Sequence, residues 1–213
     1  MKQTTIAIIN NMVARYPMLE TKRNAVVEAA ELLCETYKNG GKLLICGNGG
    51  SASDALHIVG ELMKDFCIAR PLDDDMKKKL SSVSKDAEYI YSNLQVSLPA
   101  IALVGSTAIE TAYANDRAPD LCFAQQVMGL GNEGDVLLGI STSGNSKNIV
   151  YALDVAKAKG MKTIGLTGNG GGKMANKCDL LIDAPETETY KIQELHLPIY
   201  HAICLAVENE FFG

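Results

Sequence analysis

The sequence lacks the features that would direct a protein to a membrane, to nucleic acid or into a secretory pathway. Its longest apolar runs are short, such as Leu43–Cys46, far below the roughly 20 residues that span a bilayer. There is no long basic run, and 25 acidic against 20 basic side chains give a net charge of −5, which argues against nucleic-acid or anionic-membrane binding. The first residues, MKQTTIAIINNMVARYP, contain neither the apolar stretch nor the cleavage site of a signal peptide.

The cysteines form no CxxC pair, because the six of them are scattered over positions 34, 46, 67, 122, 178 and 204. In a chain of 213 residues this scatter argues against a disulfide framework or a zinc cage, so we expect buried, reduced thiols. A hydrophobic content of 47% with 21% charged residues excludes a disordered chain and allows a full core. These observations predict a cytoplasmic α/β protein.

What the sequence does contain is an alternation of short apolar runs and helical patterns. Apolar residues at helical spacing predict two helices in residues 1–40, ending at Asn39-Gly40-Gly41, and a last helix over about 187–210 that Pro198 should kink. Five apolar runs between them predict strands buried on both faces, over 42–46, 100–104, 136–140, 163–166 and 180–183. Strands that alternate with helices are typical of a parallel sheet covered on both faces.

Residues 64–98 interrupt this alternation. They contain Pro71, three consecutive aspartates (73–75) and three consecutive lysines (77–79), but no histidine. We expect an inserted, partly helical surface segment in which opposite charges pair at i,i+4 spacing.

Two turns share a design that suits an anion. CGNGGSAS (46–53) and STSGNS (141–146) each follow a predicted strand and open a helix, where glycines allow tight turns and free amides attract negative charge. The second turn has four hydroxyls in six residues, so we interpret it as a phosphate site, with ordinary N-capping as the alternative. A third turn, 168–172, is rich in glycine without hydroxyls and predicts only a tight connection.

The first turn also satisfies a relaxed dinucleotide fingerprint, Gly47-x-Gly49-x-x-Ala52. That fingerprint requires a second strand about 30 residues into the unit, which ends in an acid that holds the ribose. Here the next clear strand begins near Ala100, and Asp65 is not at the end of a strand. A nucleotide-binding oxidoreductase is therefore disfavoured, and we expect no nucleotide cofactor.

Candidate proton carriers lie on two predicted helices. His57 and Glu61 are four residues apart and therefore share a face, which suits proton transfer or metal binding. From the spacing alone, an exposed i,i+4 pair is the simpler interpretation. The last helix contains Gln193, His196 and His201, although a histidine on a half-apolar helix is more often a packing residue than a catalyst.

Longer strings resemble a known family. They are GNGGSASDALHIVGEL (47–62), Asn115-Asp116, GDVLLGISTSGNSKN (134–148), KGMKTIGLTGNGGGKMA (159–175) and KIQELHLPIYHAIC (191–204). Together these strings are similar to the sugar isomerase (SIS) domain, specifically its phosphoheptose isomerase branch, over almost the whole chain except 64–98. The resemblance implies one SIS domain over residues 1–213, with a three-layer, flavodoxin-like α/β sandwich, a five-stranded parallel sheet, and N-terminal helices used in oligomer packing.

The resemblance also implies roles for individual residues. Those that would contact the sugar are Asn48, Gly49, Gly50, Ser51, Glu61, Asn115, Asp116 and Gln193. Those that would hold its phosphate are Ser141, Thr142, Ser143 and Ser146. Glu61 and His201 match the catalytic acid/base pair, whereas His196 matches no catalytic position. Members of this branch bind zinc, and the matching ligands here are His57, Glu61, Gln193 and His201.

The function implied is a phosphosugar aldose–ketose isomerase, which converts sedoheptulose 7-phosphate to D-glycero-D-manno-heptose 7-phosphate through an enediol. The resemblance further implies zinc as cofactor and a homotetramer with active sites near subunit contacts, and we expect neither nucleic acid nor membrane as partner. The alternative is a non-catalytic module that binds phosphosugars or associates with the replication initiator DnaA. Such a module needs no acid/base pair, so the presence of Glu61 and His201 favours the enzyme.

Two features of this sequence complicate the transfer of the family's metal site and substrate specificity to it. Gln193 and His201 are eight residues apart, about 12 Å along an unbroken helix. One metal ion therefore requires side chains that lean together, a distortion at Pro198, or a site shared between subunits. The link over 64–98 is longer than in the family, and we expect it to cap the pocket and to tune specificity rather than to carry the chemistry.

Overall fold

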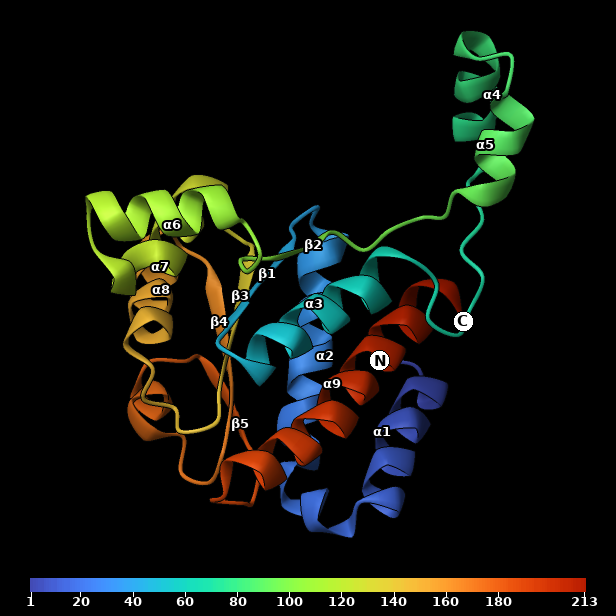
Figure 1. Cartoon of the computed structure of the whole chain (residues 1–213). Coiled ribbons are helices and arrows are strands. Elements are labelled where there is room, and N and C mark those ends of the chain that lie inside the picture. The colour runs from blue at the N-terminus through green and yellow to red at the C-terminus, as the bar shows by residue number, and fades with distance from the viewer.

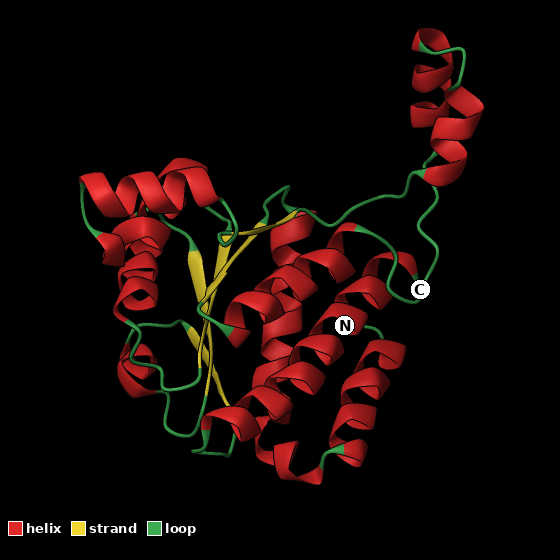
Figure 2. Ribbon diagram, viewed as in Figure 1, coloured by secondary structure: helices red, strands yellow, loops and turns green.

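The computed structural model describes all residues from 1 to 213 and contains one sheet between two groups of helices (Figures 1 and 2). Five parallel strands pair in the order β2-β1-β3-β4-β5. Their bounds are β1 Leu43–Gly47, β2 Ala100–Ala102, β3 Val136–Ser141, β4 Lys162–Thr167 and β5 Leu180–Asp183. The sequence therefore predicted every strand to within two residues, and the expected three-layer α/β class is confirmed.

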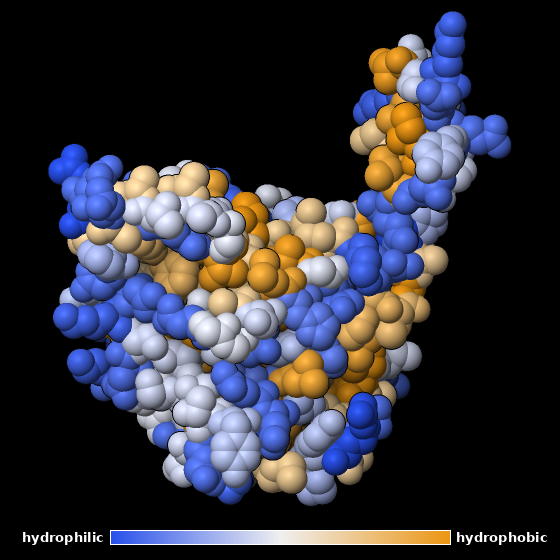
Figure 3. Space-filling view, in the orientation of Figure 1, coloured by the Kyte–Doolittle hydropathy of each residue, from blue (hydrophilic) through white to orange (hydrophobic).

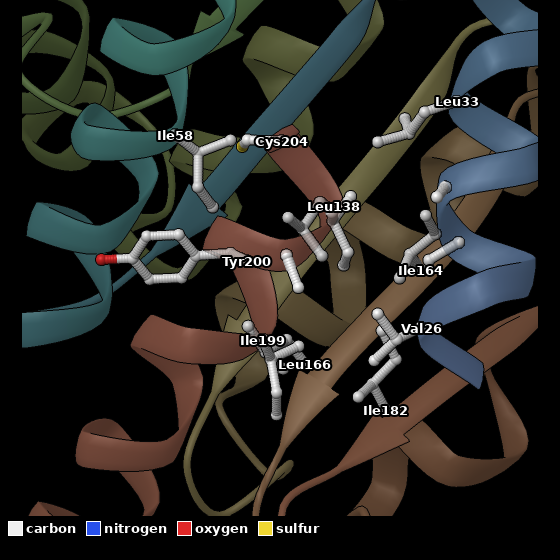
Figure 4. Close-up of a cluster of buried hydrophobic side chains, with 14 of the residues drawn as sticks. Val26, Leu33, Ile58, Leu138, Ile164, Leu166, Ile182, Ile199, Tyr200 and Cys204 are labelled. Atoms are coloured by element: carbon white, nitrogen blue, oxygen red, sulfur yellow. The ribbon is translucent and has the colours of Figure 1, made fainter. Parts of the chain in front are cut away.

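The larger group of helices covers one face of the sheet. Its members are α1 (Gln3–Arg15), the 3₁₀ helix η1 (Pro17–Lys22), α2 (Arg23–Lys38), α3 (Gly50–Met63) and α9 (Thr189–Phe212). Helices α2, α3 and α9 bury apolar side chains against the sheet, and Figure 4 shows the part of this cluster that involves β3, β4 and β5. Helix α1 packs on α9. The two expected N-terminal helices are confirmed, and Gly40, with a φ of 77°, follows the end of α2.

The smaller group covers the opposite face. It consists of α6 (Thr107–Asp116), the 3₁₀ helix η2 (Pro119–Leu121), α7 (Cys122–Leu130), α8 (Lys147–Ala158) and the 3₁₀ helix η3 (Gly172–Asn176). A second apolar cluster joins α7 and α8 to the sheet through Leu44, Leu137 and Leu153. No residue of α6 is buried, so this helix leaves no apolar stripe in the sequence by which it could be predicted.

Residues 64–98, which we expected to be an insertion, contain a hairpin of two short helices, α4 (Asp74–Val83) and α5 (Ala87–Asn93), which we call the arm. The expectation of a partly helical surface segment is confirmed, and Lys79 pairs with Asp75 at the expected i,i+4 spacing, at 2.6 Å. The arm projects away from the body of the molecule (Figure 1), and only Ala87 of its two helices is buried. Within one chain it therefore does not cap the pocket of the sugar, contrary to our expectation, since no residue of 64–98 lines either cavity that contains candidate site residues.

Residues 66–70, which we call the root of the arm, are held against the body of the molecule by hydrogen bonds and an ion pair. Arg70 and Glu208 form a fully buried ion pair, with 2.7 Å between Nη2 and Oε1. Glu208 also accepts hydrogen bonds from the amides of Phe66 and Cys67, both at 2.8 Å. Arg70 donates to two backbone carbonyls in the last turns of α3. These contacts tie residues 66–70 to α3 and α9, the two helices that contain the predicted catalytic residues.

The remaining expectations concern membranes and thiols. None of the helices combines the length and the apolar character needed to cross a bilayer. All six cysteines are free, and burial raises the pKa of Cys46 and of Cys178 to about 12. The expectation that every thiol is buried is wrong for Cys67, which is exposed at the root of the arm.

Candidate active site

The turn between β1 and α3 lies beneath a side chain from α9. Gly49 has a φ of 57°, a conformation that favours glycine. A β-carbon at Gly50 would collide with the amide of Gln193, so the absence of a side chain there lets Gln193 lie directly over the turn. Asn48 is exposed and Ser51 is buried. The structure thus brings together the predicted sugar-binding residues of this turn and Gln193.

The second turn, between β3 and α8, presents hydroxyl groups at the start of a helix, as anion-binding sites often do. Ser141 and Ser146 lie with their hydroxyl oxygens 3.0 Å apart. Ser146 is the N-cap of α8 but makes no capping hydrogen bond with its side chain, so the capping alternative does not account for this hydroxyl. Thr142 and Ser143 lie between them in the turn, the former half-buried and the latter exposed.

The glycine-rich turn at 168–172 supports the second turn from behind. A β-carbon at Gly144 would collide with the carbonyl of Gly171, and the Met174 amide donates to the Gly144 carbonyl at 3.0 Å. The Gly168 amide donates to the Thr142 carbonyl at 2.9 Å. The glycine-rich turn, which we expected to be only a tight connection, therefore also supports residues 141–146, which we call the serine turn.

Asn148 joins the two turns, and sequence reasoning missed it. The side-chain amides of Asn48 and Asn148 exchange two hydrogen bonds, of 3.0 and 2.8 Å. This pair places the turn between β1 and α3 beside the first turn of α8. Asn148 lies within the string that resembles the family, two residues after Ser146, which is the signal that could have identified it.

The predicted acid/base residues meet between α3 and α9. His57 Nε2 lies 3.1 Å from Glu61 Oε1, and the rings of His57 and His201 are 5.0 Å apart between centroids. Glu61 Oε2 and His201 Nε2 are buried without a hydrogen-bond partner; Lys64 approaches Glu61 Oε2 only as an ion pair, at 3.5 Å. The carboxylate of Glu61 and the ring of His201 can therefore each form a further hydrogen bond.

Burial and charge set the protonation of this cluster. Burial lowers the pKa of His201 below its usual value, and the neighbouring His57 and Arg15 lower it further, whereas Glu61 raises it. His201 is therefore held in its neutral form near pH 7, in which one ring nitrogen donates and the other accepts. The ring of Phe66, at the root of the arm, packs 5.4 Å from that of His201.

His196 behaves as a packing residue. Its side chain is fully buried and its Nε2 atom contacts the carbonyl of Thr167 at 3.1 Å. Burial lowers its pKa to about 4. It lies on the same helix as Gln193 and His201 but belongs to the core.

Asn115 and Asp116 are not joined to the rest of the predicted site. Both are exposed at the end of α6, where the Asn115 amide donates to the Asp116 carboxylate at 2.9 Å. No hydrogen bond connects either side chain to the two turns or to α9. Their predicted contact with the sugar therefore stays a prediction.

Two cavities adjoin the candidate site. One, of about 320 Å³, is lined by Asn48, Gly49 and Asn148 together with Glu110 and Cys122. The other, of about 350 Å³, lies between α1 and α9 and is lined by residues that include Arg15, Tyr16, Pro198 and His201. Within one chain, the turn between β1 and α3 and the ring of His201 thus open into different cavities.

The predicted zinc ligands are assembled only in part. No group of three or more His, Cys, Asp or Glu side chains is arranged to hold a metal ion, and Gln193 lies over Gly50 instead. Nevertheless, His57 Nε2 and Glu61 Oε1, 3.1 Å apart, can share one ion at the usual zinc distances of about 2.0–2.2 Å. Glu61 Oε2 and His201 Nε2 are also buried without a hydrogen-bond partner, so the donor chemistry of these residues fits zinc although their side chains are not gathered around one point.

Comparison with known proteins gives first the class of protein. The sequence profile of the SIS domain matches residues 9–92 and 94–168, which is most of the chain. That match includes both turns and the helix that contains His57 and Glu61. The fold and the two turns are accordingly those of a SIS domain.

Individual relatives give the family within this class. The phosphoheptose isomerase of Burkholderia pseudomallei is 43% identical over 202 residues, 95% of this chain and 88% of that protein; that of Aneurinibacillus thermoaerophilus is 42% identical over 187 residues, 88% and 82% of the two chains. The solved phosphoheptose isomerases of Francisella tularensis and Neisseria gonorrhoeae superpose with TM-scores of 0.76 and 0.72, at 34% and 35% identity, covering 92% and 97% of this chain and 91% and 94% of theirs. The chain belongs to the phosphoheptose isomerase family of SIS domain proteins, as the resemblance implied.

Proposed function

We propose that the protein isomerises sedoheptulose 7-phosphate to D-glycero-D-manno-heptose 7-phosphate, with Glu61 and His201 as proton carriers. The reaction moves a proton between C1 and C2 through an enediol, so it requires one group at carbon and another at the hydroxyls. The observation that carries the proposal is the cluster of His57, Glu61 and His201, in which Glu61 Oε2 and His201 Nε2 are buried without a hydrogen-bond partner.

The serine turn supplies binding rather than chemistry. Ser141, Thr142, Ser143 and Ser146 surround the start of α8, where hydroxyls and free amides favour a phosphate dianion. Because the phosphate is at the far end of a seven-carbon sugar, its anchorage fixes the distance of C1 and C2 from the proton carriers. Asn48, in the turn between β1 and α3, and Gln193, which lies over Gly50 of that turn, would contact the sugar between its two ends.

Glu61 and His201 complement each other as a pair. A carboxylate can remove a carbon-bound proton, and a neutral imidazole can pass a hydroxyl proton from one oxygen to the other. The lowered pKa of His201 keeps that ring neutral, as the second role requires. The zinc ligands would be His57, Glu61, Gln193 and His201, and the chemistry that zinc supplies when bound is stabilisation of negative charge on the substrate oxygen.

The active form in this proposal is a homotetramer. The turn at Asn48 and the ring of His201 open into separate cavities, which a neighbouring subunit could join into one site. An exposed apolar side chain, Leu197, lines the cavity between α1 and α9. The N-terminal helices, at the edge of that cavity, are the elements proposed to pack between subunits.

Turnover of a small panel of C5 to C7 sugar phosphates tests this function. We expect kcat/KM to be highest for sedoheptulose 7-phosphate, and activity to fall on treatment with a strong chelator and to return with zinc. Binding of sugar phosphates without any turnover, in zinc-loaded protein, would instead support the non-catalytic module. Analytical ultracentrifugation of the same sample measures the oligomeric state.

A further inference from the structure

The last turn of α3, which contains Glu61, is held by contacts from outside the helix. Helix α3 ends at Met63, and the carbonyls of the last turn of a helix have no partner within it. Arg70 donates to two of them, from Nη1 to Leu62 at 2.7 Å and from Nη2 to Glu61 at 3.2 Å. Its positive charge also suits the negative end of a helix dipole. These hydrogen bonds fix a helix end that would otherwise fray, and with it the backbone of Glu61.

The same guanidinium group joins this turn to α9. Its Nε and Nη2 atoms donate to Glu208 Oε1 at 3.0 and 2.7 Å, and both side chains are fully buried. Glu208 follows His201 by seven residues, which places both on one face of α9. In Figure 1 the chain that leaves α3 passes the C-terminal end of α9 before it enters the arm. Arg70 therefore connects the two helices that contain Glu61 and His201.

A further contact reaches the ring of His201. The amides of Phe66 and Cys67 donate to Glu208, both at 2.8 Å, which fixes the backbone of the root of the arm against α9. The Phe66 ring packs on the His201 ring, at a centroid distance of 5.4 Å and an interplanar angle of 61°. Glu208 therefore determines where Phe66 lies, and Phe66 restricts how the His201 ring can turn.

We propose that Arg70, Glu208 and Phe66 are positioning residues, which hold Glu61 and His201 in the relative position that proton transfer requires. The inference rests on the function proposed above, because it concerns the same acid/base pair. None of the three needs to touch the substrate. Arg70 acts on Glu61 through its backbone carbonyl, and Glu208 acts on His201 through Phe66.

The use of a charged pair favours positioning over simple stabilisation. Two buried charges lose their hydration, so apolar side chains of similar volume often give a protein that is equally stable or more so. Apolar side chains do not supply directed hydrogen bonds. Arg70 makes four of them from one planar group, and this rigid geometry sets the positions of α3, the root of the arm and α9 relative to one another.

Asp135 provides a matched control at the opposite edge of the sheet. It directly precedes β3 and is buried, whereas the candidate site follows the carboxyl ends of β1 and β3. Asp135 accepts hydrogen bonds from the amides of Lys42 and Asn132, at 2.9 and 2.8 Å, and from the Lys42 ammonium group at 2.6 Å. Like Glu208, it is a buried carboxylate bonded to two backbone amides and one cationic side chain. Its replacement should therefore have a similar structural cost without affecting the proton carriers.

Steady-state kinetics of zinc-loaded protein test the proposal, at a temperature where circular dichroism shows each variant to be folded. We expect Glu208→Gln to lower kcat by about 10²-fold, the effect of a displacement near 1 Å, with KM nearly unchanged because the serine turn is intact. Arg70→Lys keeps the charge but not the planar fork, so it should also lower kcat, and it serves where Glu208→Gln does not fold. Asp135→Asn should retain kcat. Losses of kcat no larger than that of Asp135→Asn, or losses confined to KM, would overturn the proposal.

NMR of carbon-labelled histidine rings provides a readout that needs no substrate. The chain has three histidines, and His201→Asn identifies the signals of His201. The Phe66 ring current acts on these signals, so Glu208→Gln and Phe66→Leu should both shift them. The signals of His196, which contacts Thr167 in the core, should not move.

Hydrogen exchange of the wild type keeps the proposal falsifiable even where no variant folds. We expect the amides of Phe66 and Cys67 to exchange much more slowly than those of the arm, and equal rates would show that the root is not held. A wild type with slow exchange at the root but no isomerase activity would contradict the proposed function. An active enzyme whose His201 signals are the same in Glu208→Gln and Phe66→Leu as in the wild type would contradict the positioning role alone.

Discussion

Among single residues, Glu61 has the proposed role that depends most directly on one functional group, a carboxylate that can gain and lose a proton. Glu61→Gln retains the size and most of the hydrogen bonding of the side chain but cannot cycle a proton. We therefore expect kcat to fall by at least about 10²-fold, the lower bound for general acid–base catalysis. Steady-state turnover of sedoheptulose 7-phosphate measures the loss.

Two histidines on α9 provide the matched control. His201→Asn should reduce kcat to a similar extent, because its Nε2 atom is buried without a hydrogen-bond partner and is therefore free to exchange a proton with the substrate. His196→Asn should preserve turnover, since that ring is fully buried against Thr167, although it should lower stability. Equal losses of kcat in the two variants would show that the catalytic role has been assigned to the wrong histidine.

His196 also makes stability depend on pH. Burial lowers its pKa from 6.5 to about 4, so between these values the unfolded chain binds a proton that the folded chain does not. The free energy of unfolding should therefore decrease as the pH falls from 6.5 to 4, by up to roughly 3 kcal/mol. Denaturant titrations across this range should give a flatter profile for His196→Gln, and parallel profiles would rule out this origin of the pH dependence.

At the scale of structural elements, the turn between β3 and α8 is expected to bind phosphate. Ser141→Ala with Ser146→Ala removes both hydroxyls of the 3.0 Å pair and leaves the backbone turn intact. KM for the sugar phosphate should rise more than kcat falls, since the turn binds the end of the substrate that does not react. Ser81→Ala on the exposed face of the arm is the control. An unchanged KM in the double variant would remove the phosphate assignment.

The sequence identified elements better than it identified contacts between them. The strands were predictable because β1 and β3 are buried along their whole length, which leaves uninterrupted apolar runs. Helix α6 was not, because none of its residues is buried. Within the site, the serine turn and the His57–Glu61 pair follow from local spacing. The Asn48–Asn148 and His57–Tyr200 contacts join residues 100 and 143 positions apart, and no periodicity in one sequence encodes such pairs.

At the scale of the whole molecule, the arm is the feature that extends beyond the sheet and its two covering layers. Its apolar side chains Val83 and Tyr89 are 80% and 74% exposed, and the space-filling view shows apolar surface along it (Figure 3). In one chain the arm lies away from the residues of the candidate site. Direct contact between the arm and a sugar pocket therefore requires the pocket of a neighbouring subunit in the proposed tetramer.

Shortening the arm tests whether it has such an effect. Pro71 and Gln95 are paired across an antiparallel bridge, so a short glycine-containing turn can replace residues 73–93. The variant should fold with nearly unchanged stability, because only Ala87 of the two helices is buried and the Arg70–Glu208 pair remains. Isomerisation should persist, while the ratio of kcat/KM between heptose and pentose phosphates changes.

Two further measurements make the outcome decisive. Val83→Ser with Tyr89→Ser keeps the arm but removes its two most exposed apolar side chains, and it should change the same ratio if the arm acts by contact with another subunit. Sedimentation of each variant separates a loss of assembly from a change in the pocket. A shortened chain that folds and assembles but turns over no sugar phosphate would show that the arm of one subunit completes the active site of another. Glu61, His201 and the serine turn would then be necessary for catalysis but not sufficient, because the neighbouring arm would supply part of the site.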